Sequence, residues 1–454
     1  MSKTVKLRKG LNISLLGDAD RVVEALALPS LVALKPTDFH GMTPKMVVKE
    51  GEQIKVGQVI FHDKYNESVK CVSPVSGSLK EVVRGEKRRI LEIVIATDGL
   101  QDHVSSTTLN PESASAEEVK AAMLNAGLWM FIKQRPLDVV ANPDNAPKAV
   151  FVSAFDSSPL APDYNFLLEG KEADFQTGLN ALKKLTTGKV HLTLNGKGNS
   201  AAVFSQAKGV QINKIEGKHP AGNVGTQIHH IDPINKGEFV WTVNALDVAI
   251  IGHYFNTGKI DFSRTVALTG SEVKAPKYYK TVIGAQLTSM LNDTIDTSSN
   301  VRYISGNVLT GDKVDKDGYL GFYHSHVSVI PEGDDFKFFL TTGWLGLGFD
   351  KFSNSRLFPT FLMPNKKFRL DTNTNGEERA FVVTGELERV FPFDILPMQL
   401  VKAAITDDID GMENLGIYEV APEDFALCEY VCTTKIDIQD KIRKGLDLIA
   451  KECM

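Results

Sequence analysis

Short apolar runs separated by turn residues dominate the chain from residue 36 to residue 96. The runs occupy 47–51, 56–61, 71–77 and 89–95, with Gly or Pro beside most of them. Short apolar runs bounded by Gly and Pro are typical of β-strands. The pattern predicts an N-terminal β domain over residues 1–97.

Strand-like and helix-like segments alternate from residue 98 to residue 260. A polar linker leads into helical periodicity, and a strand, a helix and a second strand follow. These four segments are 117–125, 149–152, 175–185 and 190–194. Such alternation favours a parallel, Rossmann-like α/β sheet. The apolar stretch 239–255 contains Asn244, Asp247 and His253, and we interpret it as a buried or amphipathic helix.

The pattern changes twice more toward the C-terminus. A strand, a short helix and another strand at 264–270, 284–291 and 301–306 suggest a β-grasp module, which we place at 261–375 with an aromatic-rich extension. Amphipathic periodicity then predicts helices at 396–405, 422–431 and 439–451, and so a helical domain at 376–454. The expected fold class is multidomain α/β.

Composition limits the class of protein but does not indicate a particular chemical activity. The 454 residues are 43% hydrophobic and 24% charged, with a formal charge of −5. This balance predicts a globular chain of three or four domains, and it excludes a basic nucleic-acid footprint. No apolar run reaches the roughly 18 residues that span a bilayer, and residues 1–10 lack the apolar core of a signal peptide. We expect a cytoplasmic location, with other subunits holding the chain wherever it acts at a membrane.

Four cysteines are too few for a disulfide framework in so long a chain. Cys428 and Cys432 stand one helical turn apart, so they could share a face and hold a soft metal ion. Two buried structural cysteines are the more common reason for this spacing. We therefore predict no metal site.

The strings KEGEQIKVGQVIF at 49–61 and SPVSGSL at 73–79 resemble the barrel-sandwich fold of lipoyl and biotinyl carrier domains. Lys64 falls near the position of the modified lysine in those carriers. The hairpin segment after it is longer than in lipoyl domains, and the Met-Lys-Met of biotinyl domains is absent. We interpret Lys64 as a solvated loop lysine, since fold does not imply function. A carrier domain fused to a Rossmann enzyme is an alternative that an intact-mass measurement would test.

Three further strings extend a resemblance over nearly the whole chain. They are KHPAGNVGTQIHHIDPI at 218–234, VALTGSEVKAP at 266–276 and ALCEYVCTTKIDI at 426–438. With SPVSGSL, they resemble the A subunit of the sodium-translocating NADH:quinone reductases. That family is related to the flavin-binding subunit of respiratory complex I and to the C subunit of the Rnf electron-transport complex.

The resemblance implies a barrel-sandwich domain, a Rossmann-like domain, a β-grasp module of the SLBB type and a helical end. It also implies a peripheral location at the cytoplasmic face of the inner membrane. The whole complex would pass electrons from NADH to quinone while it exports sodium. FMN, FAD, riboflavin and iron–sulfur centres would lie in partner subunits, and the chain alone would not be catalytic.

Two motifs of the relatives are missing from this chain. Relatives cradle flavin and nucleotide phosphates on a glycine-rich loop, which should fall at 127–136. That stretch has one glycine beside three bulky side chains, which would block the close backbone approach. Relatives also bind an iron–sulfur cluster with four cysteines, of which this chain keeps only Cys428 and Cys432. We expect no tightly or covalently bound cofactor, with quinone as a substrate.

Apolar walls with a few hydrogen-bond donors suit a quinone, and two segments have this character. The first, 129–135, is interpreted as a loop and contributes Trp129, Phe131, Lys133 and Arg135. Its competing interpretation is packing against the sheet or against a partner subunit. In the second, 219–230, the candidates are His219 and His229, as donors or as proton carriers near neutral pH.

The histidines also have other interpretations. A structural turn with hydrogen-bonded histidines competes with a quinone contact. Metal binding is weaker, since on a strand His229 and His230 would point to opposite faces and no carboxylate or cysteine completes a ligand set.

Four functional hypotheses follow. The favoured one is a quinone-contacting peripheral subunit next to the quinone-proximal membrane subunit. The second is a structural adaptor that docks membrane subunits without touching quinone, and the third is a carrier domain fused to a Rossmann enzyme, with Lys64 modified. The fourth is an Rnf-like electron-transport subunit.

Overall fold

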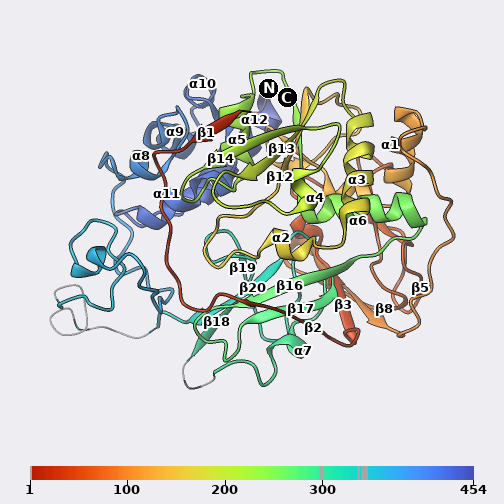
Figure 1. Cartoon of the computed structure of the whole chain (residues 1–454), viewed down its shortest axis with the longest axis horizontal. Coiled ribbons are helices and arrows are strands. Elements are labelled where there is room, and N and C mark those ends of the chain that lie inside the picture. Colours follow the sequence, from red (N-terminus) through yellow and green to blue (C-terminus); the bar gives the residue numbers. More distant parts are fainter. Residues whose placement is uncertain (1–2, 297, 299, 335–337, 339–345, 454) are drawn as a thin grey trace.

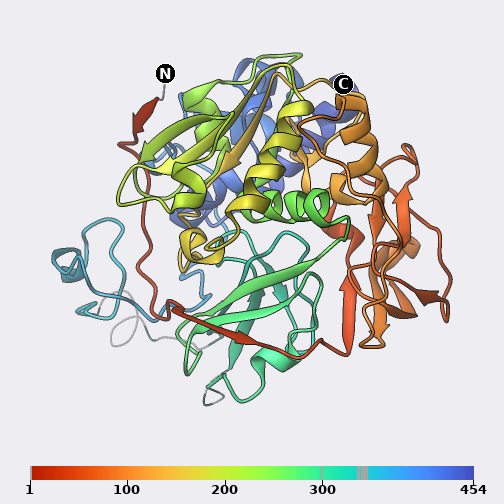
Figure 2. The same ribbon diagram turned by 45° about the vertical axis from the view of Figure 1, so that its right-hand side comes forward.

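Four groups of elements pack side by side in the molecule, as Figures 1 and 2 show. The structure is a computed structural model that describes residues 3–296, 298, 300–334, 338 and 346–453. A β-barrel region lies beside a central α/β layer, a third sheet lies beneath it, and the C-terminal helices pack behind it. The expected multidomain α/β fold is confirmed.

A seven-stranded sheet forms the centre of the α/β domain, in the order β1-β14-β13-β12-β15-β10-β11. The first five strands of this order run parallel. β10 then pairs antiparallel with β15, and β11 pairs antiparallel with β10. The strands are β1 (Thr4–Lys6), β10 (Lys133–Arg135), β11 (Val139–Val140), β12 (Ala149–Ser153), β13 (Lys189–Asn195), β14 (Gln211–Glu216) and β15 (Val240–Asn244). The predicted strands at 149–152 and 190–194 and their parallel arrangement are confirmed.

Side-chain alternation along β12 places helices on both faces of this sheet. Val150 and Val152 share a hydrophobic cluster with residues of α3 (Glu172–Lys184) and α6 (Ala245–Thr257). Phe151 lies between those two valines and packs instead with Ile228 of α5 (Val224–Ile231). Successive side chains of a strand point to opposite faces, so a run of apolar residues requires cover on both sides.

The first strands of the chain leave the N-terminal domain and join other sheets. β1 pairs with β14 of the α/β sheet, and β2 (Asp20–Ala25) pairs with β17 (Lys277–Val282). The barrel begins only at β3. Residues 4–25 therefore connect the α/β and β-grasp sheets, a long-range pairing that no local pattern indicates.

Two small sheets make the barrel-sandwich, in the orders β3-β9-β8-β5 and β4-β6-β7. Their strands are β3 (Leu31–Leu34), β4 (Pro44–Met46), β5 (Gln53–Ile54), β6 (Val59–Asp63), β7 (Lys70–Val72), β8 (Gly77–Arg84) and β9 (Ile90–Thr97). Helix α1 (Ala116–Asn125) follows the polar linker. It starts with a capping box in which Ser115 accepts from the Glu118 N–H and the Glu118 carboxylate accepts from the Ser115 N–H.

A six-stranded sheet carries the β-grasp domain, in the order β19-β18-β20-β16-β17-β2. Its strands not yet named are β16 (Ser263–Thr269), β18 (Val301–Ser305), β19 (Asp312–Val314) and β20 (His326–Pro331). The helix expected at 284–291 is shorter, because α7 spans only Thr288–Leu291. Residues 346–368 project away from the body, and the chain then returns to the helical end.

The C-terminal helices enclose a hydrophobic core of their own. They are α8 (Glu386–Val390), α9 (Pro397–Ile405), α10 (Ile409–Asn414), α11 (Ala426–Val431) and α12 (Ile438–Cys453). Cys428 and Cys432 are buried in this core, which confirms their predicted burial. Within the described part of the chain, no helix has the length and apolar character needed to cross a bilayer.

Two predicted elements are wrong. The stretch 239–255 is strand β15 followed directly by α6, not one helix, and the Asn244 side chain caps the new helix by accepting from the Leu246 N–H. The segment 127–136 is not a loop. It forms the 3-10 helix η3 (Leu128–Phe131) and then strand β10, because its apolar side chains fill the space between the barrel and the α/β sheet.

Candidate functional site

A cavity of about 230 Å³ lies at the carboxyl ends of β12 and β15. β13 and β14 lie on one side of β12, whereas β15 lies on its other side. The chain order of the strands therefore reverses between β12 and β15. Open α/β sheets bind their ligands outside the carboxyl ends of the strands at such a reversal. We call this space the sheet-edge cavity. Its lining includes Phe131, Lys133, Ser158, His219, Asp247 and Tyr323.

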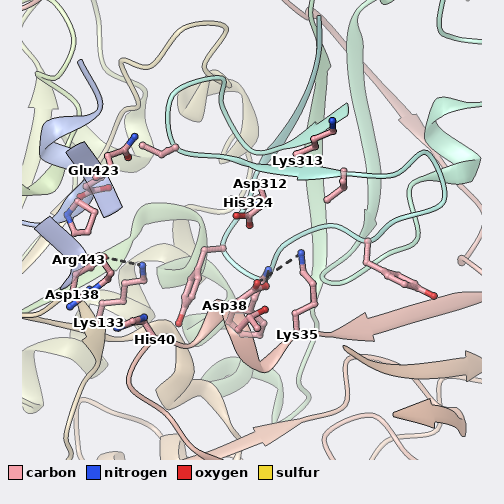
Figure 3. A pocket seen from close by; sticks show the side chains of 18 of the residues that line it. Lys35, Asp38, His40, Lys133, Asp138, Asp312, Lys313, His324, Glu423 and Arg443 are labelled. Atoms are coloured by element: carbon pink, nitrogen blue, oxygen red, sulfur yellow. Dashed lines mark hydrogen bonds and ion pairs between the residues drawn. The ribbon is translucent and has the colours of Figure 1, made fainter. Parts of the chain in front are cut away.

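A second, larger cavity of about 940 Å³ adjoins the first. Side chains from all four domains line this interdomain cavity, and Figure 3 shows the charged groups that point into it. The two cavities share Lys133, Asp138, Thr310, Tyr323 and Glu423 as lining residues. The two cavities therefore have part of their walls in common.

Phe131 and Lys133 are brought to the sheet-edge cavity, as the sequence predicted for a ligand contact. The Phe131 ring is 1% exposed and stacks on Phe322, with 5.1 Å between ring centroids. The Lys133 ammonium lies 4.5 Å from the Tyr323 ring centroid and 3.6 Å from the Asp138 carboxylate. These contacts hold a cation beside an aromatic wall, and one carboxylate partly balances its charge.

Trp129 and Arg135 lie in the same segment, but neither lines these cavities in the described structure. The Trp129 indole is fully buried and donates to the Ala141 carbonyl oxygen at 2.7 Å. The Arg135 guanidinium is 1% exposed and forms ion pairs with Asp424, at 2.7 Å, and with Glu423. Arg135 thus joins the α/β sheet to the helical domain, so its interpretation as a loop residue is wrong.

His219 lines the sheet-edge cavity and is 4% exposed. Its Nδ1 lies 3.0 Å from the Ser157 hydroxyl, which accepts from the Gly222 N–H at 2.8 Å. Burial lowers the pKa of His219 to about 4, although Asp156 favours the charged form. The imidazole is neutral at pH 7, so it can donate one hydrogen bond but is not the proton carrier near neutral pH that the sequence suggested.

His229 takes part in a contact between domains. It lies on helix α5, so the assumption that His229 and His230 occupy a strand is wrong. The Asp394 N–H donates to Nε2 at 3.0 Å, which leaves the ring proton on Nδ1, 2.9 Å from the Glu419 carboxylate. This geometry agrees with the alternative of a hydrogen-bonded structural histidine.

Asp247 is a lining residue that the sequence did not single out as a site. It is 1% exposed and pairs with Arg264, which also donates to the Phe322 carbonyl oxygen at 3.0 Å. Burial raises the pKa of Asp247 to about 6, against the lowering effect of Arg264. An Asp shortly after the end of a strand is the signal for such a residue, but the prediction of a single helix over 239–255 conceals that strand end.

Three models of known domains match the chain. A model described as the NqrA N-terminal barrel-sandwich hybrid domain matches residues 5–98, and one described as the NqrA second alpha/beta domain matches 114–260. A third, the NQRA C-terminal domain, matches 265–316.

Curated relatives match over their full length. The A subunit of the Na(+)-translocating NADH-quinone reductase of Rhodopirellula baltica is 37% identical and covers 98% of each chain. Its counterpart from Neisseria meningitidis serogroup A is 38% identical and covers 99% of this chain and 100% of its own. The chain belongs to this NqrA family. A chain of an NAD+-reducing [NiFe]-hydrogenase aligns over 76% of this chain and 64% of its own, with 12% identity and a TM-score of 0.37.

The stretch expected to replace the glycine-rich loop of more distant relatives serves packing in this NqrA family member. All four side chains of η3 are buried. Gly127 before it has a φ of 68°, and a Cβ there would lie 2.7 Å from a Val72 methyl carbon. This close contact with the barrel explains why a glycine occupies the position.

The two buried cysteines contact other groups of the helical core. The Cys432 thiol lies 3.1 Å from the Thr434 hydroxyl, and burial raises the pKa of the Cys428 thiol well above its usual range. Among the described residues, no group of three or more His, Cys, Asp or Glu side chains is arranged to hold a metal ion.

Proposed function

We propose that the chain is the peripheral subunit of a sodium-pumping NADH:quinone oxidoreductase and contributes a quinone contact at the sheet-edge cavity. Other subunits would hold it at the cytoplasmic face of the inner membrane. FMN, FAD, riboflavin and iron–sulfur centres would lie in those partners, and the neighbour at the quinone site would be a membrane subunit. The support for this role is the NqrA family membership together with the form of the cavity.

One observation carries the quinone contact: a ring-sized cavity has an aromatic wall, a cation and a neutral imidazole on its lining. Pockets for drug-sized ligands enclose about 300–1,000 Å³, so about 230 Å³ suits a single ring. Phe131 and Tyr323 supply apolar surface.

The charges suit a carbonyl oxygen that becomes negative. The Lys133 ammonium can stabilise that developing charge, and the His219 N–H can donate to a carbonyl oxygen. The Ser158 hydroxyl also lines the cavity and is buried without a hydrogen-bond partner among the described residues. Asp247, with a pKa of about 6, can give or take a proton near neutral pH.

The three remaining candidates have supporting roles in this proposal. Trp129 and Arg135 fix the segment that presents Phe131 and Lys133. His229 fixes α5, which begins beside the cavity residue Asn223. The structural-adaptor hypothesis survives if no quinone contact is found, whereas the NqrA family membership argues against the Rnf-like hypothesis.

Substitution of Lys133 in the assembled complex tests the proposal. Lys133→Met retains the aliphatic stem and removes the charge, and we expect quinone-dependent turnover to fall about tenfold, or about 1.4 kcal/mol of barrier. The matched control is Lys80→Met, at an exposed position of the barrel domain. Equal turnover in both variants and the unmodified complex would contradict the quinone contact.

A further inference from the structure

Residues 346–368 form a small unit that projects from the body of the molecule (Figures 1 and 2). We call it the apolar arm. Its outgoing and returning segments hold each other, since Thr360 donates to the Lys351 carbonyl oxygen at 2.6 Å and a Cβ on Gly348 would lie 2.0 Å from the Phe358 ring. The arm therefore has a fold of its own with little regular structure, apart from the single turn η4 (Pro359–Leu362).

The base of the arm is anchored to the body. Phe368 is 4% exposed, bridges to Leu15 in the N-terminal segment and accepts a backbone hydrogen bond from the Leu16 N–H at 2.9 Å. The rings of Phe352 and Phe368 meet edge to face with 5.5 Å between centroids. A fixed base gives the tip a defined direction.

The tip exposes large apolar side chains that the described structure leaves uncovered. Leu347 is 79% exposed, and Leu357 and Leu362 are each 70% exposed. The others are Phe349, Phe361 and Met363, between 42% and 51% exposed. Single exposed apolar residues are ordinary, but six within 17 residues form a cluster of the kind that marks an interaction site.

The charge of the arm differs from that of the whole chain. It contains the cations Lys351, Arg356, Lys366 and Lys367 against one carboxylate, Asp350, in a chain whose net charge is −5. Lys367 pairs with Asp18, and Lys351 lies 3.8 Å from Asp350. Arg356 and Lys366 have no carboxylate partner in the part of the chain that the structure describes. The apolar tip is thus bordered by positive charge.

The backbone of the arm favours a protein partner over a lipid bilayer. Irregular backbone exposes N–H and C=O groups that hydrocarbon cannot satisfy, so chain segments enter lipid as helices or closed barrels. Interfacial anchors are likewise amphipathic helices, and the arm has none. A protein surface can supply both apolar contacts and hydrogen-bond partners.

We infer that the apolar arm docks onto an apolar surface, rimmed by carboxylates, on another subunit of the complex. The inference rests on the proposed function, since it needs partner subunits. Leu357 and Leu362 would insert as apolar anchors, and Arg356 and Lys366 would pair with the acidic rim. The arm would be a site of assembly, distinct from the sheet-edge cavity.

The test uses the full chain, affinity-tagged and expressed with its partner subunits. Leu357→Ser with Leu362→Ser should lower the amount of partner subunits that co-purify at least tenfold. The matched control changes two other exposed leucines, Leu100→Ser with Leu396→Ser, which are 73% and 55% exposed. It should co-purify partners as the unmodified chain does. Arg356→Glu with Lys366→Glu should also weaken recovery, by repulsion from the acidic rim.

The outcomes separate this inference from the proposed function. Full recovery of partners by the arm variant would overturn the docking role alone, whereas an unmodified chain that recovers no partner would overturn both. A photo-crosslinking p-benzoylphenylalanine at position 362 should join the chain to another subunit. Crosslinks only to lipid, or only to a second copy of this chain, would overturn the assignment of the occupant.

Discussion

At the scale of single residues, the neighbours of each buried side chain separate the candidates that line a cavity from those that join domains. Phe131 and Lys133 reach the sheet-edge cavity, whereas Arg135, two residues further along β10, is enclosed by the helical domain. The composition of the segment was visible in the sequence. The partners of Arg135 are nearly 290 residues away, so no local pattern could reveal its role.

Arg135→Ala should destabilise the chain rather than act on turnover alone. It leaves the Asp424 carboxylate buried without its cation, and breaking a buried pair in this way costs about 3–5 kcal/mol. Arg389→Ala removes an exposed pair with Glu386 and should cost less than about 1 kcal/mol. Urea unfolding of the isolated variants measures both. Unchanged stability of Arg135→Ala with lost quinone turnover would instead favour a direct contact.

His219 should make stability depend on pH in the acidic range. Its pKa is about 4 in the folded chain and about 6.5 when unfolded, so between these values the unfolded state binds the extra proton. Folding stability should therefore fall as pH drops from 6.5 to 4. Relative to His219→Gln, the unmodified chain should lose on the order of 3 kcal/mol over this window.

Unfolding measured at several pH values tests this expectation, with His103→Gln, at an exposed position, as the control. The difference between the unmodified chain and His103→Gln should stay nearly constant. An equally constant difference for His219→Gln would show that His219 titrates alike in both states.

At the scale of elements, hydrophobic periodicity predicted those helices and strands that depend on residues close together in the sequence. The strands at 149–152 and 190–194 and the helix at 175–185 formed close to their predicted positions. The prediction of a single helix over 239–255 is wrong because a fully buried strand and a buried helix are both continuously apolar, and periodicity cannot distinguish them. The missed boundary also concealed Asp247 at the sheet edge.

Gly252→Ala should disrupt the packing of α3 against α6. A Cβ on Gly252 would lie 1.7 Å from the Asp174 carbonyl oxygen, so the two helices must separate. Overpacking of this kind costs about 1–3 kcal/mol. The control Gly376→Ala meets only side-chain atoms at 3.6 Å or more and should stay within about 1 kcal/mol. Equal melting temperatures for the two variants would contradict the close helix contact.

At the scale of the whole molecule, the N-terminal strands and the interdomain cavity depend on contacts that cross domain boundaries. The order of domains followed from the resemblance, but the pairing of β1 and β2 with sheets late in the chain did not. Phe131 and His219 meet at one cavity because the α/β sheet and the loop before α5 bring them together. The spacing of these two residues along the chain did not indicate that they line the same cavity.

The purified chain should be colourless. All four residues of 128–131 are buried, and so are the thiols of Cys428 and Cys432. An absorption spectrum of the isolated chain should show neither flavin nor iron–sulfur bands. Stoichiometric flavin absorbance would show that this part of the molecule has been misinterpreted.

Photolabelling of the intact complex is the most direct test of the quinone contact. A photoreactive quinone analogue should label peptides that contain Phe131 and Lys133, or His219, and excess unlabelled quinone should suppress this labelling. Mass spectrometry of the digested complex locates the modified residues. Labelling confined to other subunits would contradict the quinone contact and leave the structural-adaptor hypothesis in its place.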